Sequence, residues 1–364
     1  IWHRRNGKAC IVLIVVHTLT ITAGYTLTDQ TGVGKEISTL LGTYPGMVTA
    51  TIGTALLIAV VLASLMIVRR RLRYETWYVV HLLAYAGIAL GYVHQAPTGN
   101  ELTADRSAQH YWHALYIVPL ALLLTFRVVT PLLRARWHRL HVEEVVRESR
   151  SVVSVYIGGR HLNRLGARAG QFFIWRFLAR GLWLESHPFS LSAAPHGQRL
   201  RITVKASGDY TTRLAAIAPG TRVIADGPFG RFTAASRRHQ RLVLIAGGIG
   251  ITPIRALLDD ISTGSDVTVV YRALVDDDIV FRDELDQLAA ERGLQLHYLV
   301  GDHRDAASAH LLTATHLDEI VPDIRERDVF LCGPPGMVGA IRRTLRDAQV
   351  PRQNIHLEEF AFAP

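Results

Sequence analysis

The chain concentrates its apolar residues in four long runs near its N-terminus. The runs cover residues 9–27, 47–68, 77–94 and 112–133, and among them they hold a single charged residue, Arg127. A helix of about 20 apolar residues spans a hydrocarbon core of roughly 30 Å. Helices buried inside a large soluble protein are the alternative, but no comparable run follows residue 135. We therefore predict a transmembrane helical bundle in the first third of the chain.

Basic residues flank these runs on one side of the predicted membrane. They are Arg4, Arg5, Lys8, Arg69, Arg70, Arg71, Arg73, Arg134, Arg136 and Arg139. Because an excess of Lys and Arg marks cytoplasmic loops, we expect everything after about residue 140 to lie in the cytoplasm, with the bundle in the plasma membrane. These clusters account for much of the net charge of +9, so we expect no nucleic-acid partner.

The composition excludes several other classes of protein. Hydrophobic residues make up 49% of the 364 residues and charged residues 20%, which excludes a disordered chain. With Cys10 and Cys332 as its two cysteines, the chain has no disulfide framework, thiolate zinc site or cysteine-ligated iron–sulfur cluster. The chain opens with Ile1 rather than Met, so we expect a piece of a longer protein.

The sequence pattern predicts two further domains in the cytoplasmic part. Short β-rich runs separated by Gly and Pro turns predict an antiparallel barrel; they cover residues 151–157, 171–177, 201–205 and 222–225. Strand-like and helix-like runs then alternate, which predicts a parallel sheet with crossover helices. The strands are expected at 242–245, 267–271, 294–300 and 329–332, and the helices at 253–260, at 281–291 and after Pro335. We predict a multi-domain membrane protein: an all-α bundle over residues 1–140, an antiparallel β-barrel over 141–236 and an α/β Rossmann-like domain over 237–364.

Two of the predicted spans carry paired histidines, which are costly in a membrane and usually functional. His3 and His17 are 14 residues apart, which is about 21 Å along a helix with a net rotation of about 40°. His81 and His94 are 13 residues apart, so a π-bulge or bend near Gly87 and Gly91 would be needed to bring them to one face. Two stacked bis-histidine haem sites fit this pattern. Hydrogen-bonded interhelical histidines, a zinc site and a proton path remain alternatives.

Two stretches in the predicted barrel suit a flavin nucleotide. HPFSLS at residues 187–192 puts an aromatic ring beside hydroxyl groups, as an isoalloxazine ring requires. KASGDYT at residues 205–211 combines a Gly-containing turn with a lysine, as a pyrophosphate requires. Either stretch alone is also compatible with an ordinary turn.

The predicted parallel sheet carries two Gly-rich loops at strand ends. GGIGITP at residues 247–253 follows an apolar strand and opens a helix, which is typical of a phosphate site. CGPPG at residues 332–336 also ends a strand, where open α/β sheets bind ligands. Arg272 follows the second strand and either meets a 2′-phosphate or is a solvated arginine, so NADPH and NADH both remain open.

In this order the motifs resemble the ferric reductase / NADPH oxidase superfamily, whose cytoplasmic half is a ferredoxin–NADP reductase-like module. The resemblance covers essentially the whole chain and implies FAD, two haems b and a nicotinamide nucleotide. It implies that His3 and His81 hold the inner haem, and that His17 and His94 hold the outer one. The family has six transmembrane helices, and the four runs here match its third to sixth.

The resemblance also assigns the cytoplasmic residues. The implied FAD-binding residues are His187, Pro188, Phe189, Ser190, Lys205, Gly208, Asp209, Tyr210 and Thr211. The implied nicotinamide-nucleotide residues, taken with Arg272, are Gly247, Gly248, Gly250, Thr252, Pro253, Cys332, Gly333 and Pro334. Ser190 would contact flavin N5, Cys332 would lie beside the reactive nicotinamide carbon, and Phe362 would cover the flavin. These three are the expected catalytic residues.

The expected function is a transmembrane flavocytochrome that moves electrons from cytoplasmic NAD(P)H through FAD and two bis-histidine haems to an extracytoplasmic acceptor. A ferric chelate and dioxygen are both candidate acceptors. NADPH oxidases often carry a further His where this chain has Ile21, which slightly favours a metalloreductase over a superoxide-producing oxidase. A histidine-lined transporter with a regulatory nucleotide domain, and a flavin reductase merely anchored to the membrane, are the alternatives from other classes. A partner protein is a further candidate acceptor, and the sequence leaves the identity of any protein partner open.

Overall fold

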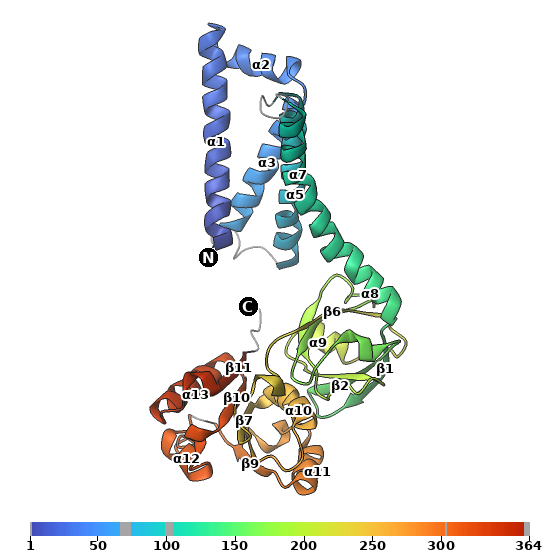
Figure 1. Ribbon diagram of the computed structural model, residues 1–364, viewed down its shortest axis with the longest axis vertical. Helices are drawn as coiled ribbons and strands as arrows, with labels where there is room; N and C mark the ends of the chain where they lie inside the picture. Colours follow the sequence, from blue (N-terminus) through green and yellow to red (C-terminus); the bar gives the residue numbers. More distant parts are fainter. Residues whose placement is uncertain (1, 66–73, 99–104, 303, 360–364) are drawn as a thin grey trace. The chain divides into compact units, whose positions relative to one another are not determined.

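The computed structural model describes residues 2–65, 74–98, 105–302 and 304–359. The chain folds as two compact units, Ile1–Leu124 and Thr125–Pro364 (Figure 1). The first unit is helical, and the second contains all the strands found among the described residues. The predicted fold class is confirmed: a helical bundle precedes an antiparallel β domain and a parallel α/β domain. The domain boundaries expected at 140/141 and 236/237 stay predictions.

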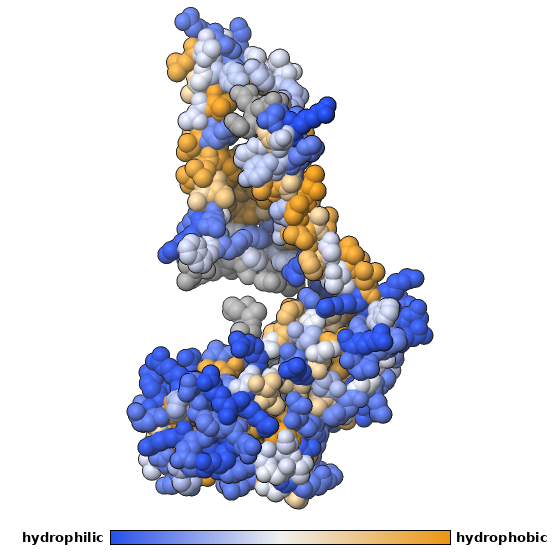
Figure 2. Space-filling view, viewed as in Figure 1, coloured by the Kyte–Doolittle hydropathy of each residue, from blue (hydrophilic) through white to orange (hydrophobic). Residues whose placement is uncertain are grey.

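The first unit consists of long apolar helices joined by short connections. Its helices are α1 (Trp2–Thr28), α2 (Val33–Thr43), α3 (Met47–Ser64), α5 (Tyr74–Thr98) and α7 (Arg106–Leu124). Four segments are long and apolar enough to cross a membrane: Trp2–Thr28, Met47–Ser64, Thr76–Gln95 and Arg106–His138. Hydrophobic side chains cover the outer surface of these helices, as Figure 2 shows. Such a surface is compatible with lipid rather than with water.

Helix α5 contains no π-bulge near Gly87 and Gly91, where the spacing of His81 and His94 would need a π-bulge or a bend. It is an uninterrupted α-helix there, and a π-helical turn lies instead at Thr125–Val129. Gly87 serves a packing role. A Cβ added to Gly53 of α3 would lie 2.7 Å from the carbonyl oxygen of Gly87, and a Cβ on Gly87 would lie 2.9 Å from Cγ of Leu57. Small residues therefore let the two backbones touch, as in other membrane helix pairs.

The antiparallel part of the second unit is a barrel built from two three-stranded sheets. One sheet has the order β1-β2-β5 and the other β4-β3-β6. The strands are β1 (His141–Arg147), β2 (Val152–Gly158), β3 (Phe172–Phe177), β4 (His187–Ser190), β5 (Leu200–Lys205) and β6 (Val223–Phe229). Bridges between Leu191 and Ile202, and between His141 and Arg222, connect the two sheets. Phe173, Trp175 and Phe177 of β3 fill the interior and are fully buried.

The parallel sheet has five strands in the order β11-β10-β7-β8-β9. They are β7 (Leu242–Gly247), β8 (Val267–Ala273), β9 (Gln295–Val300), β10 (Asp328–Gly333) and β11 (Ile355–Glu359). The accompanying helices are α10 (Ile251–Asp260), α11 (Arg282–Arg292), α12 (Ala314–Ile320) and α13 (Pro335–Asp347). The chain builds outward from β7 to β9 on one side and then returns to build β10 and β11 on the other. The topological switch point therefore lies between β7 and β10, where open α/β sheets bind ligands.

The glycine contact between α3 and α5 predicts the response of the bundle to added methyl groups. Gly53→Ala pushes a methyl group into the backbone of α5, so we expect a loss of about 1–3 kcal/mol of stability. Gly91→Ala is the matched control, because nothing lies within 4 Å of its added Cβ. Thermal unfolding of the detergent-purified protein measures both variants. Equal melting temperatures for the two would contradict the proposed contact.

Candidate functional site

Two Gly-rich loops meet at the switch point of the parallel sheet. A Cβ added to Gly250 would lie 2.4 Å from the carbonyl oxygen of Cys332, and one added to Gly333 would lie 3.2 Å from Cα of Gly247. A Cβ on Gly247 would lie 2.2 Å from Sδ of Met337 and 3.1 Å from Cδ of Pro334. Glycine is thus required for the loops to come this close. The cradle at the ends of β7 and β10 fits the pyrophosphate of a nicotinamide nucleotide, because backbone N–H groups and the start of α10 are available there.

Neighbouring residues of the GGIGITP motif hold this loop in place. Gly248 has φ of +52°, which favours glycine. The hydroxyl of Thr252 donates to the carbonyl of Ile249 at 3.0 Å, and Thr252 and Pro253 are both buried in the first turn of α10. These two residues therefore shape the loop from behind. A direct contact of either with a nucleotide stays a prediction.

Arg272 lies near the end of β8, beside β7 in the sheet. Its Nη1 donates to the carbonyls of Ala273 and Leu299, at 3.2 and 3.0 Å. Burial lowers the pKa of its guanidinium, and the charge of Asp302 opposes that shift. The guanidinium is thus held between β8 and β9, and its contact with a 2′-phosphate stays a prediction.

Cys332 of β10 lies directly beside Glu358 of β11 in the parallel register. The thiol is fully buried, and burial raises its pKa well above the ordinary value, with a further contribution from the charge of Glu358. Burial also raises the pKa of Glu358 to about 7. No role for Glu358 was predicted, because its local sequence, IHLEE at residues 355–359, carries no recognisable motif. Phe362, expected to cover the flavin, lies outside the described residues.

The HPFSLS motif forms strand β4 and the residues that follow it. Ser190 is 4% exposed, and its hydroxyl has no hydrogen-bond partner among the described residues. A buried hydroxyl without a partner costs about 1–3 kcal/mol, so a ligand atom at this position would satisfy it. The indole N–H of Trp175 donates to the carbonyl of Phe189 at 2.9 Å and fixes the strand. The orphaned hydroxyl beside an aromatic residue fits a flavin edge.

The remaining predicted flavin residues lie on β4, around the start of α9 and at the end of β5. His187 packs against Tyr210 with ring centres 4.0 Å apart, and Pro188 lies between His187 and Phe189 on the same strand. In the turn before α9 (Asp209–Leu214), the backbone N–H of Gly208 donates to the hydroxyl of Thr211 at 3.1 Å. Lys205 instead forms an ion pair with Asp278 at 3.3 Å. The phosphate contacts expected for these residues stay predictions.

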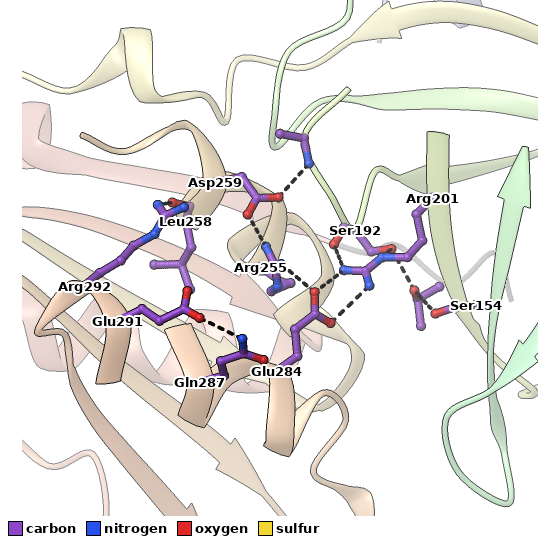
Figure 3. Close-up of polar contacts among 12 residues, drawn as sticks. Ser154, Ser192, Arg201, Arg255, Leu258, Asp259, Glu284, Gln287, Glu291 and Arg292 are labelled. Carbon is purple, nitrogen blue, oxygen red and sulfur yellow. Dashed lines mark hydrogen bonds and ion pairs between the residues drawn. The ribbon is translucent and has the colours of Figure 1, made fainter. Parts of the chain in front are cut away.

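A buried ion network joins the barrel to the parallel-sheet domain (Figure 3). Arg201 of β5 donates to both carboxylate oxygens of Glu284 in α11, at 3.0 and 3.1 Å. Arg255 of α10 also contacts Glu284, at 2.5 Å, and pairs with Asp259 at 2.7 Å. The network was not predicted, although an arginine between Leu200 and Ile202 in a barrel strand was a signal of a buried partner.

The same network reaches both candidate cofactor regions. Arg201 donates to the carbonyl and hydroxyl oxygens of Ser192, which ends the HPFSLS motif. Asp259 accepts a hydrogen bond from the backbone N–H of Ala194 at 3.0 Å. Because α10 begins at the Gly-rich loop, the network fixes the flavin side of the barrel relative to the nucleotide cradle.

The four predicted haem ligands lie on α1 and α5. The rings of His3 and His81 lie close together, with centres 5.9 Å apart and planes inclined by 68°. The two imidazoles therefore meet, as the predicted pairing of these residues requires, and their role as ligands of one iron stays a prediction. Trp77 stacks on His81 at 4.9 Å.

His17 and His94 form the second candidate pair. Gly46, with φ of +80°, lies against the backbone of His94: an added Cβ would be 2.7 Å from its Cα. Among the residues that the structure describes, no group of three or more His, Cys, Asp or Glu side chains could hold a metal ion. The described residues therefore contain no multi-ligand site of the kind that the zinc alternative would use. The arginine cluster at residues 69–73, which contributed to the predicted orientation, lies outside the described residues.

Comparison with known families divides the chain as its architecture does. Residues 1–92 match a ferric reductase like transmembrane component, residues 140–233 an FAD-binding domain, and residues 244–343 an oxidoreductase NAD-binding domain. Together these three matches are those of the ferric reductase/NADPH oxidase superfamily. The matched domains and the relatives below place the chain among NAD(P)H-dependent oxidoreductases.

Relatives of this ferric reductase-like chain share parts of it. An NADPH oxidoreductase of Mycobacterium tuberculosis is 28% identical over 269 residues, which are 69% of this chain and 69% of that protein. A flavohemoprotein of a Burkholderia species is 30% identical over 61% of this chain, which spans 58% of that protein. Dual oxidase 1 of Sus scrofa is 26% identical over 48% of this chain, which spans 15% of that protein.

Solved structures match the part of the chain that carries the FAD- and NAD-binding domains. The FAD/NAD-binding domain of a nitric oxide dioxygenase from Vibrio cholerae is 26% identical, with a TM-score of 0.51, over 61% of this chain and 98% of that domain. An Amycolatopsis cytochrome P450 reductase shares the fold at 24% identity and a TM-score of 0.52, over 61% of this chain and 69% of that one.

Breaking the ion network is expected to uncouple the barrel from the nucleotide domain. Glu284→Gln leaves Arg201 and Arg255 without their shared carboxylate, at a cost of about 2–4 kcal/mol, since a buried cation loses its partner. Flavin reduction by NADPH is expected to slow as well. Chemical denaturation and stopped-flow absorbance measure the two effects.

The control is Glu326→Gln, which removes a partly exposed partner of Arg241 and is expected to cost below about 1 kcal/mol. Equal stability losses in the two variants would contradict a coupling role for Glu284.

Glu358 is expected to make stability depend on pH. Its pKa is raised in the folded chain to about 7, so its contribution is fully present at pH below the ordinary carboxyl value and is lost as the pH rises to about 7. Glu358→Gln should remove this decline, whereas Glu359→Gln, at an exposed neighbour, should keep it. Denaturant unfolding from pH 4.5 to 8 measures the difference, and a parallel pH profile for wild type and Glu358→Gln would contradict the assignment.

Proposed function

We propose that the protein is a transmembrane flavocytochrome that carries electrons from cytoplasmic NAD(P)H to an acceptor on the opposite side of the membrane. The observation that carries this proposal is the facing pair His3–His81, on two membrane-length helices of a chain with a ferric reductase-like segment and an FAD/NAD-binding unit. We further propose that the plasma membrane holds the bundle, with residues after about 140 in the cytoplasm.

The chain's own residues have distinct parts in this proposal. FAD would accept a hydride from the nicotinamide and the two haems would carry single electrons. Gly247, Gly250 and Gly333 would cradle the nucleotide, and the Ser190 hydroxyl would hydrogen-bond to the flavin. Cys332 and Glu358 would hold protons beside the nicotinamide in a site that excludes water.

The histidines would hold the two haems. His3 and His81 would supply two imidazole nitrogens to the inner haem, and His17 and His94 would do so for the outer one. Because each iron would already have two ligands from the chain, the acceptor would not need to bind the metal. Trp77, stacked on His81, would hold that ring in its orientation.

Absorption spectroscopy of the detergent-purified protein tests the proposal. We expect two haems and one FAD per chain, with both haems reduced by NADPH under anaerobic conditions. His81→Ala and His94→Ala should each lower the haem content by one, because each removes an axial ligand. His110→Ala, at an exposed position, should leave it unchanged. Nucleotide binding without haem would contradict the flavocytochrome and favour a histidine-lined transporter.

A further inference from the structure

Three basic side chains near the predicted flavin stretches each contact a carboxylate of the chain. Nε2 of His187 lies 3.3 Å from Oε2 of Glu185, and Nη2 of Arg213 lies 3.5 Å from Oε1 of the same glutamate. Nζ of Lys205 lies 3.3 Å from Oδ1 of Asp278. His187 and Lys205 are the two basic residues among those expected to bind FAD. A phosphate group of FAD would therefore compete with these carboxylates for the same side chains.

The hydroxyl of Tyr210 marks a position for a ligand oxygen beside His187. Tyr210 is 6% exposed, and its ring centre lies 4.0 Å from that of His187. Its buried hydroxyl has no hydrogen-bond partner among the described residues. Burial raises the pKa of Tyr210, with a further contribution from the charge of Glu185, so the phenol stays protonated and can donate. An acceptor oxygen of a phosphate group would satisfy this donor.

The connection between β3 and β4 holds Glu185 beside both of its basic partners. Arg176 of β3 donates to the carbonyl of Trp183 at 2.8 Å, two residues before Glu185. The side chain of Glu185 is 28% exposed, compared with 39% for His187 and 50% for Arg213. The carboxylate is thus the least solvated member of the group. The fold therefore keeps this negative charge close to the basic side chains rather than in open solvent.

Asp278 belongs to the other domain of the second unit. It ends the short helix η5 (Asp276–Asp278) of the parallel-sheet domain, whereas Lys205 ends β5 of the barrel. The backbone N–H of Val280 donates to the hydroxyl of the buried Tyr271 at 3.1 Å, which anchors the segment that carries Asp278. The Lys205–Asp278 pair therefore links the two domains. A phosphate group that binds Lys205 would release this link.

The carboxylates and the phosphates of FAD carry charge of the same sign. Phosphate oxygens form strong, charge-assisted hydrogen bonds with arginine, lysine and protonated histidine. A phosphate group bound to these side chains would also meet repulsion from Glu185 and Asp278 at short range, unless the two carboxylates withdraw and lose their own partners. In either case, part of the free energy of flavin binding is lost.

We propose that two carboxylates of the chain, those of Glu185 and Asp278, lower its affinity for FAD; the proposal rests on the flavin-dependent function above. They compete with the FAD phosphates for the side chains of His187, Lys205 and Arg213. Flavin binding exchanges one set of ionic contacts for another, so its net gain is the difference between the two sets. FAD is therefore held reversibly, and the fraction of chains that carry it depends on the concentration of free FAD.

Titration of FAD into the flavin-depleted full chain in detergent tests the proposal without relying on activity. The change in FAD fluorescence on binding gives the Kd. Glu185→Gln and Asp278→Asn should each bind FAD more tightly, by about three- to tenfold, because each removes a competitor and its repulsion. Arg213→Gln should instead bind FAD more weakly by about the same factor, because it removes a basic partner of the phosphates.

Matched controls remove a negative charge elsewhere in the same unit. Glu144→Gln takes a partner from Arg199, and Asp276→Asn takes one from Arg282; both should leave the Kd for FAD unchanged. The direction of the change is decisive, because carboxylates that only position the basic side chains would favour binding. Unchanged or weaker FAD binding by Glu185→Gln and Asp278→Asn would therefore overturn the inference and leave the proposed function intact. Absence of FAD binding in wild type and in every variant would overturn both.

Discussion

Backbone contacts that only glycine permits determine the geometry of both candidate functional regions. In the bundle, Gly53 and Gly87 bring α3 against α5, and Gly46 brings the turn before α3 against His94. In the second unit, Gly250 packs on the carbonyl of Cys332, and Gly247 meets Gly333. At each position a single methyl group would have to displace backbone or a packed side chain. The main chain therefore fixes the positions of the residues that would hold ligands in both regions.

The elements predicted correctly from the sequence are those whose environment is uniform along their length. The transmembrane helices are surrounded by lipid, so hydropathy alone predicts them. Strands β7, β8 and β10 are buried on both faces and therefore read as continuous apolar runs. The motifs GGIGITP and CGPP were predictable because glycine and proline mark strand ends.

Other elements were missed because their structure depends on contacts with residues that are distant in the chain. Strand β4 contains His187 and Pro188, which locally favour a turn, yet pairing with β3 makes it a strand. Helix α2 buries Glu36, so its pattern is not that of a simple apolar stripe. The pairing of Arg201 with Glu284 joins residues 83 positions apart, and no local pattern encodes such a partner. The packing role of Gly87 could not be predicted, because a glycine suits both a bend and a close helix contact, and only the facing helix distinguishes them.

The second unit combines rigidity between its two domains with protonatable groups in its parallel sheet. Arg201, Glu284, Arg255 and Asp259 restrict the motion of the barrel against α10 and α11. Glu358 and Cys332 lie on neighbouring strands, where burial favours the neutral form of each. Neutral groups around the nicotinamide position would leave the negative charge of a reduced flavin as the main charge there. The ion network thus fixes the geometry of the two domains, whereas the neutral groups of Glu358 and Cys332 set the electrostatic environment.

The burial of Cys332 also bears on resistance to oxidative damage. Peroxide and other oxidants attack the thiolate of cysteine rather than the thiol. Cys332 is fully buried, and its raised pKa keeps it protonated in neutral solution. An electron-transfer protein whose reduced flavin leaks electrons to oxygen would generate such oxidants beside this residue. The same burial that raises the pKa of the Cys332 thiol would therefore also protect its sulfur from such oxidants.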